Sequence, residues 1–236
     1  MLVNLIKRSN EAELMDDPNV DEKDLAIALY DISRVNRLLG GNSITINSVL
    51  EKIKANENKR EWIIADLGCG DGEMLRQLAD VLRKKGVKAK LIGIDNNKKC
   101  LSQANNLSKS YTEIIYKNID ILTLTKEDFS CDIILCTLTL HHFKDDEIKE
   151  VLQKSLELVS SALIINDIHR NTWSYYLFKV FSYFFIKGRI AKNDGLVSIK
   201  RGFKRKELVS FAEDLGLKKY QLHWKWAFRY RWIINN

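Results

Sequence analysis

The stretch IIADLGCGDGEML, residues 63–75, carries glycine at every second position, as Gly68, Gly70 and Gly72. An apolar run that ends in an aspartate precedes these glycines, and a helix-like segment follows them. Glycine lets the backbone approach a ligand closely and adopt positive φ without a Cβ clash. The spacing is G-x-G-x-G rather than G-x-G-x-x-G, and no G-x-x-x-x-G-K-[ST] motif is present. The sequence of this loop therefore predicts a cofactor-binding site of a kind that does not bind phosphate groups.

From residue 61 onward, short β-branched runs alternate with segments of helical length. The runs are WIIADL, KLIGID, EIIYKNID, CDIILCTL and ALIINDI, and helices are expected at 73–85, 98–108 and 146–159. Apolar strands that alternate with helices predict a parallel sheet covered on both faces. After residue 200, KRKELVSFAEDLGL predicts one more helix, and KKYQLHWKW with FRYRWII predicts a closing antiparallel pair.

The first part of the chain, residues 1–58, is expected to be a helical extension of a single domain at 59–236. The segment DEKDLAIALYDISRVNRLL places Leu25, Leu29, Ile32 and Val35 near one helix face, and Gly40-Gly41 should end that helix. A second helix is expected after Asn47, through SVLEKIKA.

Length and composition narrow the class of protein. The chain has 236 residues, 45% of them hydrophobic, which suffices for one α/β domain with a substantial core. Its four cysteines are scattered, with no CxxC pair and no His/Cys cluster at zinc spacing, so we expect a reduced, cytosolic protein without a structural metal. Neither a secretory leader nor a membrane span is predicted. The net charge of +7 permits nucleic acid or a phospholipid surface as a partner, and solubility explains it equally well.

Three aspartates stand near the ends of successive predicted strands. Asp66 precedes the glycine loop, where it would suit a cationic ligand such as a sulfonium or an ammonium. Asp95 ends the second strand, placed to accept from both hydroxyls of a ribose. Asp120 ends the third strand, within reach of an adenine amino group. Singly, each carboxylate reads as a helix cap or a loop acid, but together they predict a nucleoside site with a cationic group.

These motifs resemble those of the class I S-adenosylmethionine-dependent methyltransferases. The matching residues are ADLGCGDGEML, Asp95, NIDIL and CDIILCTLTLHHF, and the resemblance covers about residues 60–236. It implies a Rossmann-like, doubly wound α/β sheet of seven strands, the last antiparallel, with S-adenosylmethionine as cofactor. It also implies these contacts to the cofactor: Gly68, Cys69 and Gly70 at the methionine part, Asp95 at the ribose, Asn96, Asp120 and Ile121 at the adenine, and the backbone of Cys136 near the methionine amine.

The N-terminal helix and the segment IINDIHR…YYLFK…KNDGLVSIKRGF are similar to a bacterial subgroup that methylates small molecules, often in polyketide, phenolic-lipid or aryl-polyene synthesis. Nucleobase N-methyltransferases commonly carry [DNS]-P-P-[YF] after the fourth strand, where this chain reads CTLTLHH. A magnesium-assisted enzyme would need an Asp/Asn set that cannot be assembled without the cofactor acids. We therefore expect metal-free SN2 transfer to oxygen on an aromatic or lipid-like acceptor. The alternatives are an RNA methyltransferase, a membrane-surface quinone or lipid methyltransferase, and a non-catalytic partner subunit.

The histidines are candidate bases, because imidazole titrates near neutral pH and can take a phenolic proton. His141 and His142 follow the fourth strand directly, at the expected rim of the acceptor pocket. An equally open interpretation is that His141 packs structurally and His142 caps the next helix. His169 is the reserve candidate, and Asp167 either orients it or faces the cofactor. His223 is expected to be structural.

The segment TWSYYLFKVFSYFFI, residues 172–186, is an aromatic helix by its composition. It falls within an expected cap, about residues 171–203, where Trp173 and Tyr176 would contact the acceptor. Core packing, a homodimer interface and contact with an anionic membrane through the basic run that follows are the alternatives. Arg34, in the N-terminal helices, would meet the cofactor carboxylate or an acidic acceptor. We therefore expect a cytoplasmic protein, with peripheral contact to the inner membrane surface as an alternative.

Overall fold

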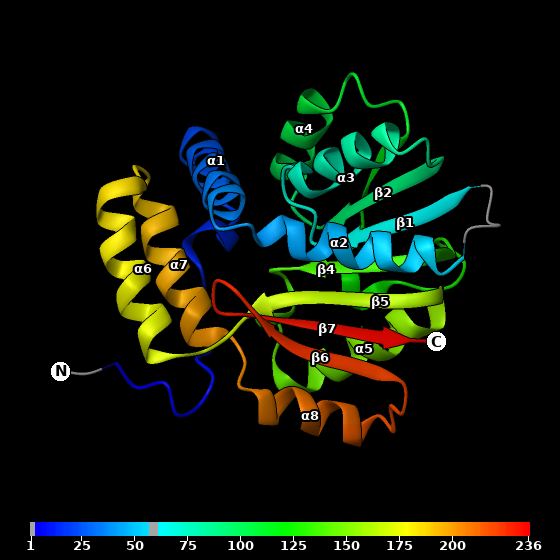
Figure 1. Ribbon diagram of the computed structural model, residues 1–236. Helices are drawn as coiled ribbons and strands as arrows, with labels where there is room; N and C mark the ends of the chain where they lie inside the picture. The colour runs from blue at the N-terminus through cyan, green and yellow to red at the C-terminus, as the bar shows by residue number, and fades with distance from the viewer. Residues whose placement is uncertain (1–2, 57–60) are drawn as a thin grey trace.

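The central sheet has seven strands in the order β3-β2-β1-β4-β5-β7-β6. In the computed structural model, which describes residues 3–56 and 61–236, every neighbouring pair is parallel except those that involve β7. The predicted doubly wound sheet with an antiparallel last strand is confirmed (Figure 1). The strand bounds are β1 Trp62–Leu67, β2 Ala89–Asp95, β3 Ile114–Asn118, β4 Cys131–Thr137, β5 Val159–Ile168, β6 Tyr220–Lys225 and β7 Arg229–Asn235.

Helices cover both faces of the sheet because each presents an apolar stripe at helical spacing. On one face, α2 and α3 pack through residues such as Val49, Leu75 and Leu78. On the other face, α5 and α8 pack through residues such as Leu152 and Phe211. The helix bounds are α1 Glu22–Leu38, α2 Gly41–Lys54, α3 Glu73–Lys84, α4 Lys98–Leu107, α5 Asp145–Leu158, α6 Thr172–Phe185, α7 Arg189–Arg201 and α8 Arg205–Asp214, with short 3₁₀ turns η1 Leu14–Asp16, η2 Ile121–Thr123 and η3 Leu140–His142.

The second helix begins earlier than the sequence predicts. Gly40, at φ +70°, turns the chain directly from α1 into α2, so α2 starts at Gly41 rather than after Asn47. The buried Asn166 side chain, near the end of β5, donates to the Gly41 carbonyl over 2.9 Å and so fixes the start of α2 on the sheet. The predicted boundary between residues 58 and 59 lies outside the described residues.

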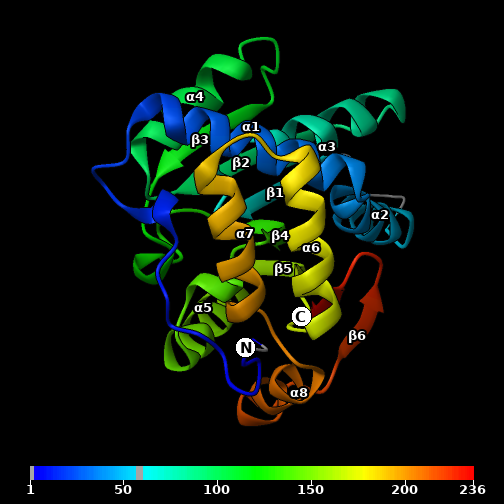
Figure 2. The ribbon, with the colours of Figure 1, turned by 90° about the vertical axis from the view of Figure 1, so that its left-hand side faces the viewer.

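Helices α6 and α7 form an antiparallel pair that stands beyond the carboxyl ends of the strands, in the place predicted for a cap (Figures 1 and 2). Helix α1 runs alongside this pair, so the N-terminal segment and the cap enclose one end of the sheet. The strand order reverses between β1 and β4, and ligands of such sheets bind at the carboxyl end of that switch point. The fold therefore places a covered ligand site at the glycine loop.

Candidate active site

The glycine loop after β1 needs glycine at each alternate position. Gly68, Gly70 and Gly72 have φ of +69°, +55° and +76°, a region that side chains with a Cβ rarely adopt. The main-chain N–H groups of Gly68 and Cys69 both donate to the Ile94 carbonyl, over 2.8 and 3.1 Å. The loop is thus held against the end of β2, and its tip faces a cavity.

Asp95, at the end of β2, joins the glycine loop to the start of α4. Its Oδ2 accepts from the Gly70 N–H over 2.9 Å, and its Oδ1 accepts from the Asn97 N–H over 2.8 Å. Burial raises the pKa of the Asp95 carboxyl. Each carboxylate oxygen can accept a second hydrogen bond. Asp95 can therefore hold a pair of ligand hydroxyls while it fixes the loop.

Asp66, the penultimate residue of β1, is a buried acid. Its side chain is 2% exposed, and its Oδ1 has no hydrogen-bond partner within residues 3–56 and 61–236. Burial and the nearby Asp95 raise the pKa of Asp66 to about 8. A cationic group bound beside this carboxyl would favour its ionised form. This arrangement fits the ammonium or sulfonium of S-adenosylmethionine.

The cavity above the loop has a volume of about 830 Å³ and brings together most of the residues predicted to hold the cofactor. Cys136 differs: it is buried inside β4, and the next residues, Thr137, Leu138 and Thr139, line the cavity in its place. The predicted cofactor residues that do line the cavity are Asp66, Gly68, Cys69, Gly70, Asp95, Asn96, Asp120 and Ile121.

The opposite wall of the cavity is apolar and comes from α1, the cap and the β6–β7 turn. Phe178 and Phe181 point inward from α6, and Ile32, Trp226 and Phe228 also line this wall. Close packing of the cap requires Gly195 on α7, since a Cβ there would lie 2.1 Å from the Phe178 ring. The helix that the sequence marks as aromatic thus gives one face to the cavity.

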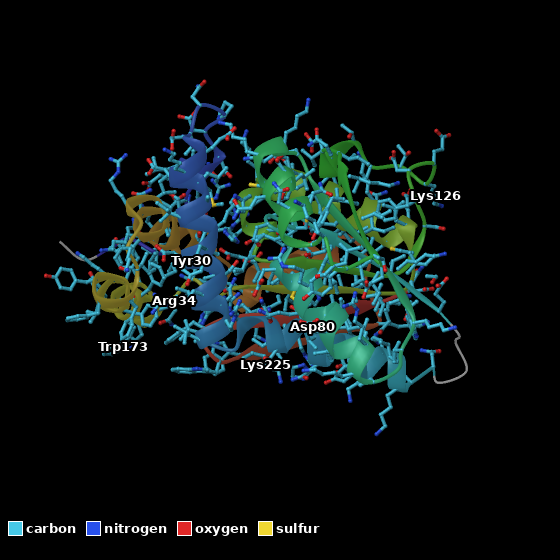
Figure 3. The ribbon with its side chains drawn as sticks, turned by 90° about the horizontal axis from the view of Figure 1, so that it is seen from above. Tyr30, Arg34, Asp80, Lys126, Trp173 and Lys225 are labelled. Atoms are coloured by element: carbon cyan, nitrogen blue, oxygen red, sulfur yellow. The ribbon has the colours of Figure 1, made fainter. Side chains whose placement is uncertain are left out.

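The three residues predicted to contact the acceptor lie outside this wall. Arg34 donates to the Phe185 carbonyl over 3.4 Å, and the Tyr176 hydroxyl accepts from the Val3 N–H over 3.3 Å. Trp173 is 72% exposed, and Figure 3 shows it at the outer edge of the molecule. None of the three lines the cavity in the described part of the chain. Helical phase explains the difference, because Trp173 and Tyr176 sit on other faces of α6 than Phe178 and Phe181.

His141, in η3 after β4, is buried between two carboxylates. Its Nδ1 lies 2.7 Å from Oδ1 of Asp167, and its Nε2 lies 3.4 Å from Oε1 of Glu13. Burial alone would lower the pKa of His141, but Asp167 and Glu13 outweigh burial and raise it to about 9. For Glu13 the effects are reversed: burial alone would raise the pKa of its carboxyl, but the two imidazoles lower it to about 2.

His142 lies beside His141 and also faces the Glu13 carboxylate. Its Nδ1 lies 3.1 Å from Oδ2 of Asp16, and its Nε2 lies 3.8 Å from Oε2 of Glu13. All four of these side chains line the cavity. Neither histidine caps the following helix, because the residue at the N-cap of α5 is Lys144. The prediction that Asp167 would orient His169 or face the cofactor is wrong, since Asp167 orients His141.

His169 takes another role. Its Nδ1 accepts from the Trp224 indole N–H over 3.3 Å, and its ring centroid lies 4.9 Å from that of Tyr230. Burial lowers the pKa of His169. His169 is absent from the cavity wall of residues 3–56 and 61–236, so the structure places it in the packing between β5 and the β6–β7 hairpin.

Sequence reasoning missed Glu13 and Asp16, which reach the site from a segment ahead of the first helix. The main-chain N–H groups of Leu14 and Met15 donate to Asp194 of α7 over 2.8 and 2.9 Å, which fixes this segment against the cap. Arg8 and Arg201 both donate to the His141 carbonyl over 3.0 Å. No local pattern marks such long-range contacts, so the sequence offers no signal for them.

Comparisons with known proteins agree with this fold. Residues 64–161 match the family described as methyltransferase domain. The carboxy-S-adenosyl-L-methionine synthase of Campylobacter jejuni is 26% identical over 176 residues, which cover 70% of this chain and 72% of that protein. The structure of the plantazolicin methyltransferase BpumL with SAH has a TM-score of 0.67 at 16% identity, covering 91% of this chain and 96% of that one. The magnesium protoporphyrin IX methyltransferase of Synechocystis PCC 6803 with SAH has a TM-score of 0.55 at 19% identity, covering 83% and 82%.

The domain match over residues 64–161 and the fold agree with the class I S-adenosylmethionine-dependent methyltransferases. Its cofactor is S-adenosylmethionine. The buried Asp66 carboxyl, whose Oδ1 has no hydrogen-bond partner in the described residues, and the alternate-glycine loop fit a nucleoside ligand with a cationic group.

Proposed function

We propose that the protein transfers the methyl group of S-adenosylmethionine to an oxygen atom of a small aromatic or lipid-like hydroxyl compound. One observation carries this proposal: a single cavity joins the polar cofactor cradle to an apolar wall that includes Phe178, Phe181 and Phe228. An apolar wall with a few polar groups favours an apolar ligand whose orientation those groups fix.

The polar groups on the acceptor side suit a hydroxyl. Glu13, His141 and His142 lie together in the cavity wall, and each offers an atom that can bind an O–H group. Transfer by SN2 attack requires an oxygen that is aligned with the methyl group and has lost its proton. We therefore propose that the acceptor hydroxyl binds at this cluster.

RNA is a less favoured acceptor. The sequence lacks the [DNS]-P-P-[YF] element after β4, and the cap and α1 cover the cavity with apolar side chains. RNA binding with a steep salt dependence would favour this alternative. A non-catalytic partner subunit is the remaining alternative, and it would bind the cofactor without turning it over.

A second candidate function rests on Arg229, the first residue of β7. This residue is 7% exposed, its Nη2 donates to Asn36 over 2.6 Å, and its Nη1 has no partner within the described ranges. Burial lowers the pKa of Arg229 to about 10, so it stays cationic at neutral pH. A buried guanidinium with a free N–H suits a carboxylate. Because one relative is a carboxy-S-adenosyl-L-methionine synthase, we propose as the alternative activity that a carboxylic acid bound at Arg229 gives its carboxyl group to the S-methyl carbon and receives a proton from that carbon in exchange.

The outer face of α6 supports a lipid-like acceptor. Trp173, Tyr183 and Phe184 are each more than 70% exposed, and Lys179 and Lys187 lie exposed on or just after the same helix. Exposed aromatic side chains beside cations suit an anionic membrane surface. Within residues 3–56 and 61–236, the structure has no helix with the length and apolar character needed to cross a membrane. We propose peripheral contact through this face, on the inner membrane surface of a cytoplasmic protein.

The membrane contact is tested by sedimentation with phosphatidylglycerol vesicles, with phosphatidylcholine vesicles as the comparison. We expect binding to the anionic vesicles that weakens at high salt and in Tyr183→Ser/Phe184→Ser. A homodimer in solution that the same double variant dissociates would instead show that α6 is a subunit interface.

The activity is tested by incubating purified protein with S-adenosylmethionine and a panel of apolar phenols and long-chain alcohols. We expect S-adenosylhomocysteine to form only with an acceptor, together with a product heavier by one methylene unit. A carboxylated cofactor that forms when carboxylic acids are added in place of the alcohols would support the second candidate. Binding of S-adenosylmethionine without turnover on any acceptor would support the non-catalytic alternative.

A further inference from the structure

Three metal-ligating groups meet in the cavity wall from distant parts of the chain. Glu13 precedes η1, and His141 with His142 belongs to η3. One carboxylate oxygen and the two imidazoles offer atoms that all lie within 4.8 Å of one another. The Nε2 atoms of His141 and His142 lie 3.4 and 3.8 Å from the Glu13 oxygens. Ligands about 2.0–2.1 Å from a tetrahedral Zn²⁺ are separated by about 3.3 Å, so the three groups would move closer together to bind an ion between them.

Each histidine is already oriented for this role. His141 Nδ1 lies 2.7 Å from Asp167, and His142 Nδ1 lies 3.1 Å from Asp16. A histidine that ligates a metal almost always donates its other ring N–H to a carboxylate or carbonyl, which fixes its tautomer and ring orientation. Here both rings have such a carboxylate, and both Nε2 atoms are turned toward Glu13.

The site also has a buried nitrogen without a hydrogen bond of normal geometry, and more carboxylates than imidazoles. His141 is 2% exposed, and its Nε2 makes no hydrogen bond of normal geometry within the described residues. Three carboxylates, from Glu13, Asp16 and Asp167, surround the two imidazoles. A divalent cation that displaces the proton from His141 Nε2 would supply a ligand partner for the buried nitrogen and would offset the carboxylates.

We propose that Glu13 and the Nε2 atoms of His141 and His142 bind a divalent cation of the zinc class. Two imidazoles favour Zn²⁺, Co²⁺ or Fe²⁺ over Mg²⁺, which prefers oxygen ligands. Because the three residues line the cavity, the fourth coordination position faces the space where an acceptor would bind. An ion there would act as a Lewis acid that makes a bound hydroxyl easier to deprotonate. The sequence has no CxxC pair and no His/Cys cluster at zinc spacing, so it does not predict this site.

The experiment measures metal alone, without cofactor or acceptor, so its result does not depend on the proposed methyl transfer. Purified protein is stripped with a chelator and titrated with Zn²⁺ by calorimetry, and with Co²⁺ by visible absorption. We expect one ion per chain, an intense Co²⁺ spectrum typical of tetrahedral coordination, and no competition from millimolar Mg²⁺. Bound Zn²⁺ should also raise the melting temperature, because only the folded state holds the ligands together.

Variants assign the ion to the site. Glu13→Gln, which preserves the side-chain size, and His142→Ala should each lower Zn²⁺ affinity more than about 100-fold, beyond the effect typical of changes to orienting carboxylates. His223→Ala, on β6, is the matched control and should bind like the wild type. Circular dichroism and thermal melting show whether each variant is folded. Folded wild type that binds no Zn²⁺ or Co²⁺, or binding that Glu13→Gln and His142→Ala leave unchanged, would overturn the proposal.

Discussion

The His141 ring is joined to Asp167 by a contact of 2.7 Å between Nδ1 and Oδ1, which links the turn after β4 to the end of β5. The same carboxylate also accepts from the main-chain N–H groups of His141 and Ile168, over 3.2 and 2.7 Å. Asp167 is 1% exposed, so its position is fixed by the fold rather than by solvent. This pair holds His141 Nε2 toward Glu13 and thereby shapes the part of the cavity where we propose that the acceptor binds.

Replacement of this carboxylate tests its orienting role. Asp167→Asn keeps the side-chain volume but removes the charge, and its amide nitrogen cannot accept the hydrogen bonds that the carboxylate accepts. We expect Zn²⁺ affinity to fall about 10–100-fold, and turnover to fall with it. Calorimetric titration of folded variant protein measures the change. Unaltered Zn²⁺ affinity would show that the pair serves only the packing of η3 on β5.

The stability of the ligand-free protein should depend on pH through Asp66. Its folded-state pKa of about 8 lies above the unfolded value, so the folded state keeps a proton that the unfolded chain loses. The protonated Asp66 therefore adds to the free energy of unfolding. This addition is fully present below about pH 4 and is lost as the pH rises to 8, by up to about 1.4 kcal/mol per pH unit. Denaturant unfolding from pH 5 to 8 should therefore show Asp66→Asn gaining stability relative to wild type. A difference that does not change with pH would contradict the assigned protonation state.

Cofactor binding should release the proton held by Asp66. A cation beside the carboxyl favours the ionised form, so S-adenosylmethionine should displace close to one proton near pH 7. Calorimetry in buffers of different ionisation enthalpy measures that release. We expect the release to disappear in Asp66→Asn. Equal proton release by both proteins would assign it to another group.

Asp95 should support both the ribose and the glycine loop. Asp95→Ala removes the acceptor of the Gly70 N–H and the predicted acceptor of the ribose hydroxyls. We expect the free energy of S-adenosylmethionine binding to weaken by about 1.5–3 kcal/mol. Isothermal titration measures this loss, and Asp80→Ala, a surface change on α3, serves as the control. Full affinity in Asp95→Ala would remove this residue from the cofactor site.

The packing of α6 on α7 should control the acceptor wall. A Cβ at Gly195 would lie 2.1 Å from the Phe178 ring, so Gly195→Ala must displace this ring. We expect a loss of about 1–3 kcal/mol in the free energy of unfolding and a higher KM for apolar acceptors. Phe178→Leu in the same protein should recover part of the stability, because the smaller side chain leaves room for the methyl group. Additive effects of the two changes would contradict the contact.

Much of the sheet could be predicted because its signals are local. Period, β-branching and turn residues mark each strand, and alternate glycines mark the loop, so these local signals predict Asp66 and Asp95 at strand ends, while Asp120 lies just after β3, at the N-cap of η2. Glu13 and Asp16 could not be found in this way, since their role depends on a contact with residues more than 120 positions away. The face of α6 that lines the cavity could not be predicted either. Apolar residues lie all around this helix, so their spacing does not indicate which face points inward.

The proposed transfer to oxygen is tested most directly by the position of the methyl group in the product. S-adenosylmethionine labelled with ¹³C in its methyl group is incubated with the protein and the phenol that supports the fastest turnover, and the product is examined by carbon NMR. We predict a single labelled methyl on an oxygen atom, one equivalent of S-adenosylhomocysteine, and a strong loss of both in His142→Ala. A label on carbon or nitrogen, or a cofactor that retains its labelled carbon and gains a carboxyl group, would contradict it.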